Sequence, residues 1–243
     1  MDKYKVKILD IKNEYDNVFT YSLEKPEELQ WDEGSSFHLA LSDYDKGGVV
    51  NKKLVHHLSI NTLTDEDCIR FTTKIPIRKS VFKKALSKLE VGDYVTIYEF
   101  DSNMSLIRED KPLVLLSQGL AMSTIRPLIK KYEQDRANIP ELTSININAN
   151  DIHLYESDFQ DIDSQILEKY WINNRADYIE TIKELAREKN DAYFYIVGSE
   201  HFVLDTLYIL RENGIALDKL IIDKDSNKRN IVFKTLENYK IIL

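Results

Sequence analysis

Short stretches in which apolar and polar residues alternate fill the first hundred positions of the chain. Residues 4–8, Tyr-Lys-Val-Lys-Ile, show the pattern, which is typical of a half-buried strand. Polar or glycine-containing turns separate these stretches. The pattern predicts six strands, at residues 4–8, 18–23, 36–41, 54–60, 69–75 and 94–98. Short strands at this spacing predict a small antiparallel β-barrel.

One amphipathic helix interrupts the predicted strands, at residues 80–89. Its apolar residues recur at helical spacing, and Ser80 is a good N-cap. Four lysines lie around the rest of it, at positions 79, 83, 84 and 88. A solvated cationic face is the simplest interpretation of these lysines.

After residue 110 continuous apolar runs alternate with helical patterns, which is typical of a parallel α/β sheet. The predicted strands are 113–116, 144–148, 193–197 and 220–222, and the predicted helices are 123–135, 161–170, 176–188 and 202–213. A last strand is predicted at 238–243. The polar stretch 101–111 precedes Pro112 and separates the two patterns. We therefore expect two domains, residues 1–108 and 109–243.

Composition excludes several classes of protein. The 243 residues carry a formal charge of −8, which argues against nonspecific nucleic-acid binding. No apolar run approaches the ~20 residues of a membrane span. The charged N-terminus has no signal-peptide core, and Cys68 alone makes neither a disulfide nor a cysteine-ligated metal site, so we expect a cytoplasmic protein without metal. With seven glycines, the chain also lacks a three-glycine dinucleotide fingerprint.

Eight local strings occur along the chain in one order. They are HHLS at 56–59, FTTK at 71–74, KSVF at 79–82, VGD at 91–93, PLVLLSQG at 112–119, STIRP at 123–127, NNR at 173–175 and YIVGS at 195–199. Their order and spacing resemble the ferredoxin–NADP reductase family of flavoenzymes, which includes the flavodoxin reductases. The resemblance covers roughly residues 3–222. It implies an FAD-binding barrel followed by an NAD(P)-binding α/β domain.

The resemblance implies that residues 56–59 hold FAD. In the family this string is Arg-x-Tyr-Ser/Thr: the Arg pairs with the pyrophosphate, the Tyr packs on the isoalloxazine, and the hydroxyl reaches flavin N5. Here His56, His57, Leu58 and Ser59 take these positions. Alternation along a strand puts His56 and Leu58 on one face and His57 and Ser59 on the other. Ser59 is the implied catalytic residue. The alternative is that both histidines are surface or interface residues.

The resemblance also places the FAD phosphates at the start of the helix that Ser80 opens. A helix N-terminus offers free N–H groups and a positive dipole end. The hydroxyl of Ser80 and the backbone of Val81 and Phe82 are the implied ligands, with Thr73 and Lys74 close by. The alternative is an ordinary N-capped helix.

The implied nicotinamide site follows the strand at 113–116. The family has a turn there of roughly Gly-Gly-x-Gly-x-Thr/Ser-Pro. This chain keeps Gly119 and Ser123, and has Gln118, Ala121 and Thr124 where the family has Gly, Gly and Pro. The added side-chain atoms predict weaker nucleotide binding. The alternative is a plain strand-to-helix turn.

Two further strings belong to the same implied site. Gly198 and Ser199 match the string beside the nicotinamide, where Val197 replaces a cysteine of the family. Arg175 matches an Arg that pairs with the 2′-phosphate of NADPH, which predicts that NADPH is preferred over NADH. The alternative for Arg175 is a solvated charge at the start of a helix.

Two functions follow from the resemblance. The first is an FAD-dependent oxidoreductase that passes hydride from NAD(P)H to flavin N5, and then electrons to a redox partner such as flavodoxin or ferredoxin. The second is a non-catalytic or regulatory relative that binds flavin or nucleotide without turnover. The departures at Gln118, Ala121, Thr124 and Val197, and at His56 and Leu58, favour the second. An α/β hydrolase is disfavoured because no Gly-x-Ser-x-Gly string is present.

Overall fold

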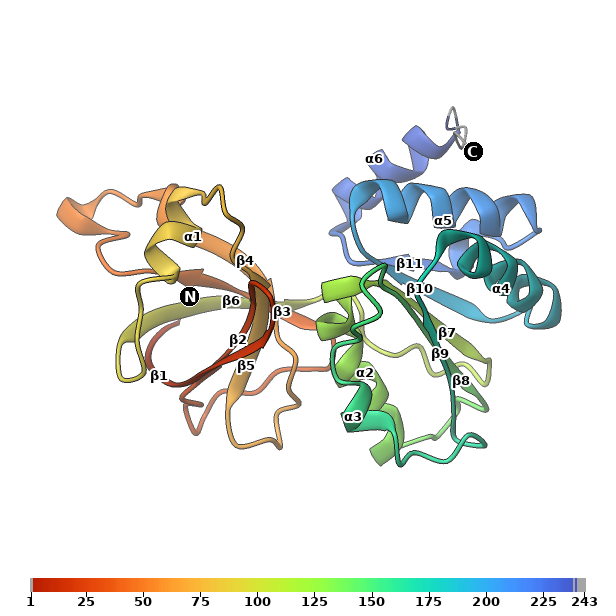
Figure 1. The fold of residues 1–243 in the computed structure, drawn as a ribbon, viewed down its shortest axis with the longest axis horizontal. Helices are drawn as coiled ribbons and strands as arrows, with labels where there is room; N and C mark the ends of the chain where they lie inside the picture. The colour runs from red at the N-terminus through yellow and green to blue at the C-terminus, as the bar shows by residue number, and fades with distance from the viewer. Residues whose placement is uncertain (1, 238, 240–243) are drawn as a thin grey trace. The chain divides into compact units, whose positions relative to one another are not determined.

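The computed structural model describes residues 2–237 and 239. The chain divides into two compact units, Met1–Ser105 and Leu106–Leu243 (Figure 1). This division and the predicted boundary at 108/109 both fall between the last strand of the first unit and the first strand of the second. Each unit has its own sheet and its own hydrophobic core.

The first unit is a curled, antiparallel sheet of six strands. They are β1 (Lys3–Tyr15), β2 (Val18–Leu23), β3 (Ser35–Ala40), β4 (Val55–Ser59), β5 (Ile69–Lys74) and β6 (Tyr94–Ser102), in the order β4-β3-β6-β1-β2-β5. The two edges come together just beyond β4, where the Asn61 N–H donates to the carbonyl of Arg70 at 2.9 Å and Asn61 Nδ2 donates to Thr72 Oγ1 at 2.8 Å. The predicted barrel-type fold is confirmed. The sheet is a partly closed barrel, because its two edge strands are joined by these hydrogen bonds just beyond β4 and do not pair along their whole length.

One short helix, α1 (Val81–Leu86), covers an end of this sheet. Ser80 caps it, because its hydroxyl accepts the N–H of Lys83 at 3.2 Å. Phe82 and Leu86 are buried in the core of the unit, which fixes the inner face of the helix. The helix is shorter than the predicted 80–89.

The second unit is a parallel sheet between helices. Its strands are β7 (Leu113–Gln118), β8 (Leu142–Ile147), β9 (Leu167–Ile172), β10 (Tyr193–Val197) and β11 (Leu220–Ile222), in the order β11-β10-β7-β8-β9. The helices are α2 (Met122–Gln134), α3 (Glu156–Phe159), α4 (Arg175–Glu188), α5 (Glu200–Glu212) and α6 (Ser226–Leu236). Figure 1 shows α2 and α3 on one face of the sheet and α4 and α5 on the other. The predicted parallel α/β fold is confirmed.

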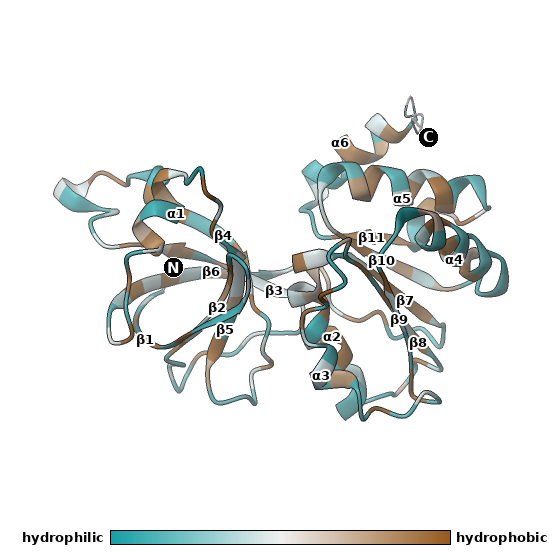
Figure 2. Ribbon diagram, viewed as in Figure 1, coloured by the Kyte–Doolittle hydropathy of each residue, from teal (hydrophilic) through white to brown (hydrophobic). Residues whose placement is uncertain are grey.

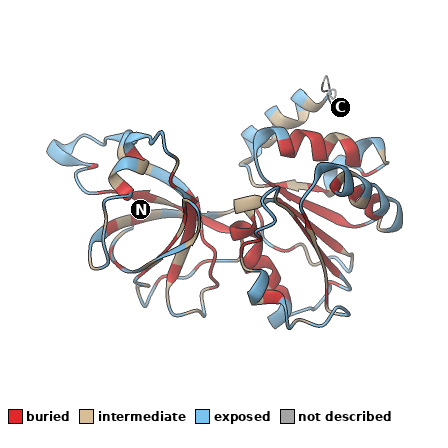
Figure 3. Cartoon of the chain, viewed as in Figure 1, coloured by how far each residue is buried: buried red, intermediate tan, exposed pale blue. Residues whose placement is uncertain are grey.

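Burial explains why the second unit has this architecture. Residues 113–116 of β7 are fully buried, as expected of a central strand with helices on both faces. Helices α4 and α5 have apolar stripes toward the sheet and polar outer faces (Figure 2), and the buried residues concentrate on the strands (Figure 3). Within the described residues, no helix is long and apolar enough to cross a membrane.

The second unit differs from the sequence analysis in some of its elements. The helix predicted at 161–170 is wrong, because residues 167–172 form β9, paired in parallel with β8 from Leu142↔Leu167 to Ile147↔Ile172. Edge strand β9 buries only its two ends, and the polar pair Glu168 and Lys169 in its middle obscured the strand pattern. Helix α6 was not predicted. The strand predicted at 238–243 lies outside the described residues.

Candidate functional site

The second unit has a topological switch point between β7 and β10. From β7 the chain goes outward through β8 and β9, then returns to the other side of β7 to form β10 and β11. In open parallel sheets, ligands bind at the carboxyl ends of the two strands where the order reverses. Here those ends carry the turn 119–121 after β7 and the turn 198–199 after β10. The predicted residues Gly119, Gly198 and Ser199 therefore share one edge of the sheet.

Glycine is required in these two turns for different physical reasons. Gly119 has φ +51°, and a Cβ there would meet only Asn148 side-chain atoms, at 3.9 Å and beyond. A Cβ on Gly198 would lie 2.4 Å from Phe202 Cδ1 and 3.1 Å from Gln118 Cβ. Gly119 thus supplies a left-handed backbone, and Gly198 supplies room for its neighbours.

Gln118 connects the two turns directly. Ser199 Oγ donates to Gln118 Oε1 at 2.8 Å, and the same hydroxyl accepts the N–H of Phe202 at 3.3 Å to cap α5. This hydrogen bond spans the switch point. A ligand lying across the turns must rearrange or accommodate the Gln118 side chain.

A buried polar network holds the turn that follows β7. Asn146 Nδ2 donates to Ser117 Oγ at 2.8 Å and to the carbonyl of Gly119 at 3.3 Å. Its Oδ1 therefore accepts from His153 Nδ1, at 2.7 Å. The His153 side chain is 3% exposed, and burial lowers its pKa although Glu156 and Asp151 act in the opposite direction. Sequence reasoning missed this network, which holds the backbone of the predicted nucleotide turn.

The other two residues predicted beside this turn are buried. Ser123 and Thr124 lie in the first turn of α2, with 6% and 3% of their surface exposed. Their side chains belong to the packed base of the site, whereas the residues of the turn 119–121 are partly exposed.

Arg175 lines a cavity of about 420 Å³ beside the switch point. Apolar side chains from β8, α4 and α5 form part of its wall, and Gln118 lies at its edge. The Arg175 guanidinium, about half exposed, forms an ion pair with Asp205 Oδ2 at 2.7 Å. Arg175 is the first residue of α4, and Asn174 is its N-cap.

In the first unit, β4 places the four predicted FAD residues on two faces. His56 packs against the Phe82 ring, with 4.9 Å between ring centroids, and Leu58 is 8% exposed within the core. On the other face, His57 Nε2 lies 2.7 Å from Ser36 Oγ, and Ser59 is half-buried opposite Ser36. The predicted alternation is present. Leu58 offers little surface for covering an aromatic ring.

The helix α1 contributes one lysine to the interior. Lys83 Nζ donates to the hydroxyl of Thr73, a buried residue of β5, and lies 5.8 Å from the Phe82 ring centroid. Among residues 2–237 and 239, no carboxylate lies within ion-pair distance of Lys83. Burial lowers the pKa of Lys83 from 10.5 to about 8. A half-buried ammonium group beside a hydroxyl, with no counter-charge, is suited to bind an anion.

This arrangement changes the interpretation of the lysine-rich helix. Lys79, Lys84 and Lys88 are exposed, as the sequence suggested, but Lys83 points inward. Partial burial of the ring, and secondly the charge of Lys83, lower the pKa of His56, so Lys83 is the stronger cation of the two near pH 7. Ser80 and Val81 are exposed beside it, and Lys74 is exposed at the end of β5.

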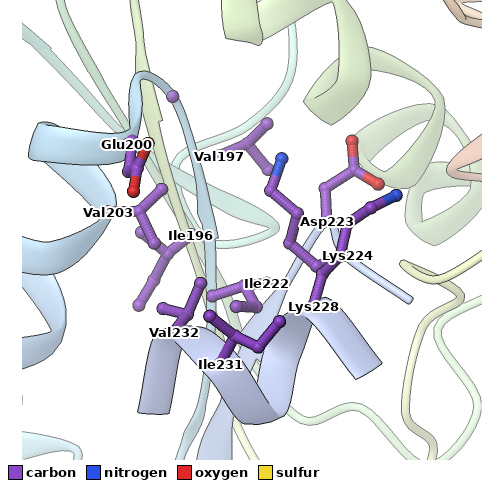
Figure 4. Close-up of a pocket in the computed structure, with 11 residues that line it drawn as sticks. Ile196, Val197, Glu200, Val203, Ile222, Asp223, Lys224, Lys228, Ile231 and Val232 are labelled. Atoms are coloured by element: carbon purple, nitrogen blue, oxygen red, sulfur yellow. The ribbon is translucent and has the colours of Figure 1, made fainter. Parts of the chain in front are cut away.

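A second cavity, of about 260 Å³, lies on the other side of the β10 turn (Figure 4). Its apolar wall comes from β10, β11, α5 and α6, and Figure 4 shows the charged groups of Glu200, Asp223, Lys224 and Lys228 around it. Lys228 is already paired with Asp225 at 2.7 Å. Within the described part of the chain, no group of three His, Cys, Asp or Glu side chains is arranged to hold a metal ion.

Comparison with known proteins finds similarity in fold. No family model matches the chain, and no curated protein matches its sequence significantly. The ferredoxin NADP+ reductase of Neisseria gonorrhoeae, solved with bound FAD and NADP, superimposes with a TM-score of 0.74 at 15% identity, covering 90% of this chain and 97% of that one. The ferredoxin-NADP+ reductase of Plasmodium falciparum gives 0.73 at 15% identity, covering 90% and 95%.

A third solved structure shows the same fold inside a larger protein. The CS-b5R domains of human Ncb5or, in the NAD+ form, superimpose with a TM-score of 0.72 at 15% identity, covering 92% of this chain and 70% of that one. At these identities the similarity establishes the fold. The chain therefore has the two-unit fold of ferredoxin-NADP+ reductases.

Proposed function

We propose that the chain is an FAD-dependent oxidoreductase that takes electrons from a nicotinamide nucleotide and passes them to a small redox protein such as flavodoxin or ferredoxin. The observation that carries the proposal is Lys83, a half-buried ammonium group without a carboxylate partner in the described part of the chain. A pyrophosphate supplies the missing negative charge. The fold, shared with reductases that bind FAD and NADP, supports the same assignment.

The residues present fit the phosphate half of FAD. Lys83 would supply the cation and Thr73 a hydroxyl, while the Ser80 hydroxyl and the first N–H groups of α1 would donate to the remaining oxygens. Ser59 on β4 would hydrogen-bond near flavin N5 and orient the ring. When both groups are bound, the nicotinamide supplies the hydride and the flavin accepts it.

The second unit would hold the nicotinamide nucleotide at the switch point. The backbone of the turn 119–121 would approach the pyrophosphate, with Gly198 and Ser199 on the other side. Asn146 would keep the turn in place by holding the Gly119 carbonyl. A location in the reducing cytoplasm is part of the same proposal and is compatible with the single free Cys68.

A non-catalytic, regulatory flavin- or nucleotide-binding role is the second candidate. It is favoured by Leu58, which has no aromatic ring to pack on the flavin, and by the Gln118–Ser199 hydrogen bond across the nucleotide edge. One experiment separates the two. Purified protein is titrated with FAD, and the flavin absorption is followed anaerobically as NADH or NADPH is added. Bleaching supports the reductase, bound but unbleached flavin supports the second candidate, and no FAD binding refutes both flavin roles.

A further inference from the structure

The cavity of about 420 Å³ in the second unit combines an apolar wall with one balanced charge pair. Ile147, Ile179, Phe202 and Ile209 line the apolar part, which suits a flat heterocycle such as adenine. The ionisable lining groups are Arg175, Asp205, His201 and Tyr178. Among these described lining residues, Arg175 is the only permanent cation, and Asp205 offsets its charge.

Asp205 is held rigidly within this cavity. Its side chain is 10% exposed, and its two oxygens lie 2.7 Å from Arg175 Nη2 and 2.7 Å from the Tyr239 hydroxyl. His201 Nε2 lies 3.3 Å from it, one turn earlier on α5. Desolvation, and then the hydrogen bond to Asp205, raise the pKa of Tyr239 to about 12, so the phenol remains a donor to the carboxylate at neutral pH.

We propose that Asp205 makes this cavity an adenosine site that selects NAD(H) over NADP(H). The inference rests on the proposed function, because it assigns the adenosine half of that nucleotide. A fixed carboxylate accepts a hydrogen bond from a ribose 2′-hydroxyl. A 2′-phosphate instead brings negative charge against the carboxylate, and binding it through Arg175 takes the guanidinium away from Asp205.

This proposal is opposite to the preference that the sequence suggested for Arg175. An unpaired Arg would recognise a 2′-phosphate through charge-assisted hydrogen bonds. This guanidinium already donates to Asp205, thirty residues away in the sequence. The resulting pair has no excess positive charge. We expect NAD+ to bind at least about tenfold more tightly than NADP+, because juxtaposed like charges are costly.

The test uses two ligands that differ only in the 2′-phosphate. The full chain is titrated calorimetrically with 5′-AMP and with 2′,5′-ADP, and then with NAD+ and NADP+. The wild type should bind 5′-AMP and NAD+ more tightly. Asp205→Asn should change the ratio of the dissociation constants of 5′-AMP and 2′,5′-ADP by about tenfold in favour of 2′,5′-ADP. Glu200→Gln is the matched control, since it removes the same charge from an exposed position of α5 outside this cavity, and should leave the ratio unchanged.

A second variant keeps the test decisive if Asp205→Asn fails to fold. Arg175→Gln should leave the preference for 5′-AMP intact. Tighter binding of 2′,5′-ADP by the wild type, abolished in Arg175→Gln, would overturn the inference while leaving the proposed nucleotide site standing. If none of the four ligands binds, the nucleotide half of the proposed function fails, and the inference fails with it.

Discussion

Replacing Lys83 with Met should have opposite effects on stability and on FAD binding. The ammonium group is half-buried and lacks a carboxylate partner among the described residues, and burial lowers its pKa from 10.5 to about 8. That shift corresponds to about 3 kcal/mol, an upper bound because the Thr73 hydroxyl and nearby solvent remain in contact with the group. Methionine keeps the stem that packs beside Phe82 and removes the charge.

The direction of the stability change follows from the pKa. A lysine whose folded pKa is lowered destabilises the fold at every pH below about 8, and this cost disappears as the pH rises through 8 toward 10.5. At pH 7 the FAD-free Lys83→Met protein should therefore be more stable by about 1–3 kcal/mol, a rise of about 2–4 °C in unfolding midpoint per kcal/mol. FAD should bind about 10- to 100-fold more weakly, because a charge-assisted hydrogen bond is worth about 1.5–3 kcal/mol.

Two assays measure these effects on the same preparations. Thermal unfolding without flavin gives the stability, and quenching of flavin fluorescence gives the FAD affinity. Lys84→Met is the matched control, since Lys84 is an exposed neighbour on the same helix and should change neither quantity appreciably. Wild-type affinity should also decline as the pH rises past about 8. A Lys83→Met protein that is less stable than the wild type, or that binds FAD equally well, would refute the reasoning.

Three further predictions concern other parts of the two units. Gly198→Ala should lower the free energy of unfolding by about 1–3 kcal/mol in urea, because the added Cβ would lie 2.4 Å from Phe202 Cδ1. An unchanged unfolding midpoint would show that the added methyl group causes no steric clash. His153→Phe should reduce the loss of stability between pH 7 and pH 5, because a buried His whose pKa is lowered below 6.5 destabilises the fold as the pH falls, although Asp151 and Glu156 act to raise that pKa. If the free energy of unfolding of the variant changes with pH as much as that of the wild type, His153 is not the source of the pH dependence. Ser59→Ala should leave the unfolding midpoint unchanged and slow flavin reduction in stopped flow, and an equal rate would remove Ser59 from the proposed role.

The sequence predicted the two-part architecture because the two hydrophobic periods are distinct. Alternation before residue 100 and continuous apolar runs after 110 correspond to a sheet with one buried face and a sheet with two. The pattern was insufficient for β9, an edge strand whose central residues are half exposed and whose pairing with β8 decides its conformation. Local pattern does not include that pairing.

The candidate sites show a similar limit. The turn residues Gly119 and Gly198 could be proposed from sequence because they follow predicted buried strands and lie in strings that resemble those of the family. The inward direction of Lys83 could not, since it depends on Thr73 in a strand that packs beneath the helix. The Arg175–Asp205 pair joins two helices and has no local signature. Long-range contacts of this kind determine whether a charged side chain is solvated or part of a site.

The central place of β7 also constrains how the second unit is made on the ribosome. Strand β8, which pairs with one edge of β7, is synthesised soon after it. Strand β10, which pairs with the other edge of β7, is synthesised only with residues Tyr193–Val197. Until then the nascent chain carries a strand whose residues 113–116 are all apolar, with an open row of backbone donors and acceptors along one edge. Such an edge is a template for pairing between chains. Stalled or truncated products that end before residue 193 are therefore expected to be prone to aggregate, and shortened versions of this unit need to include β10.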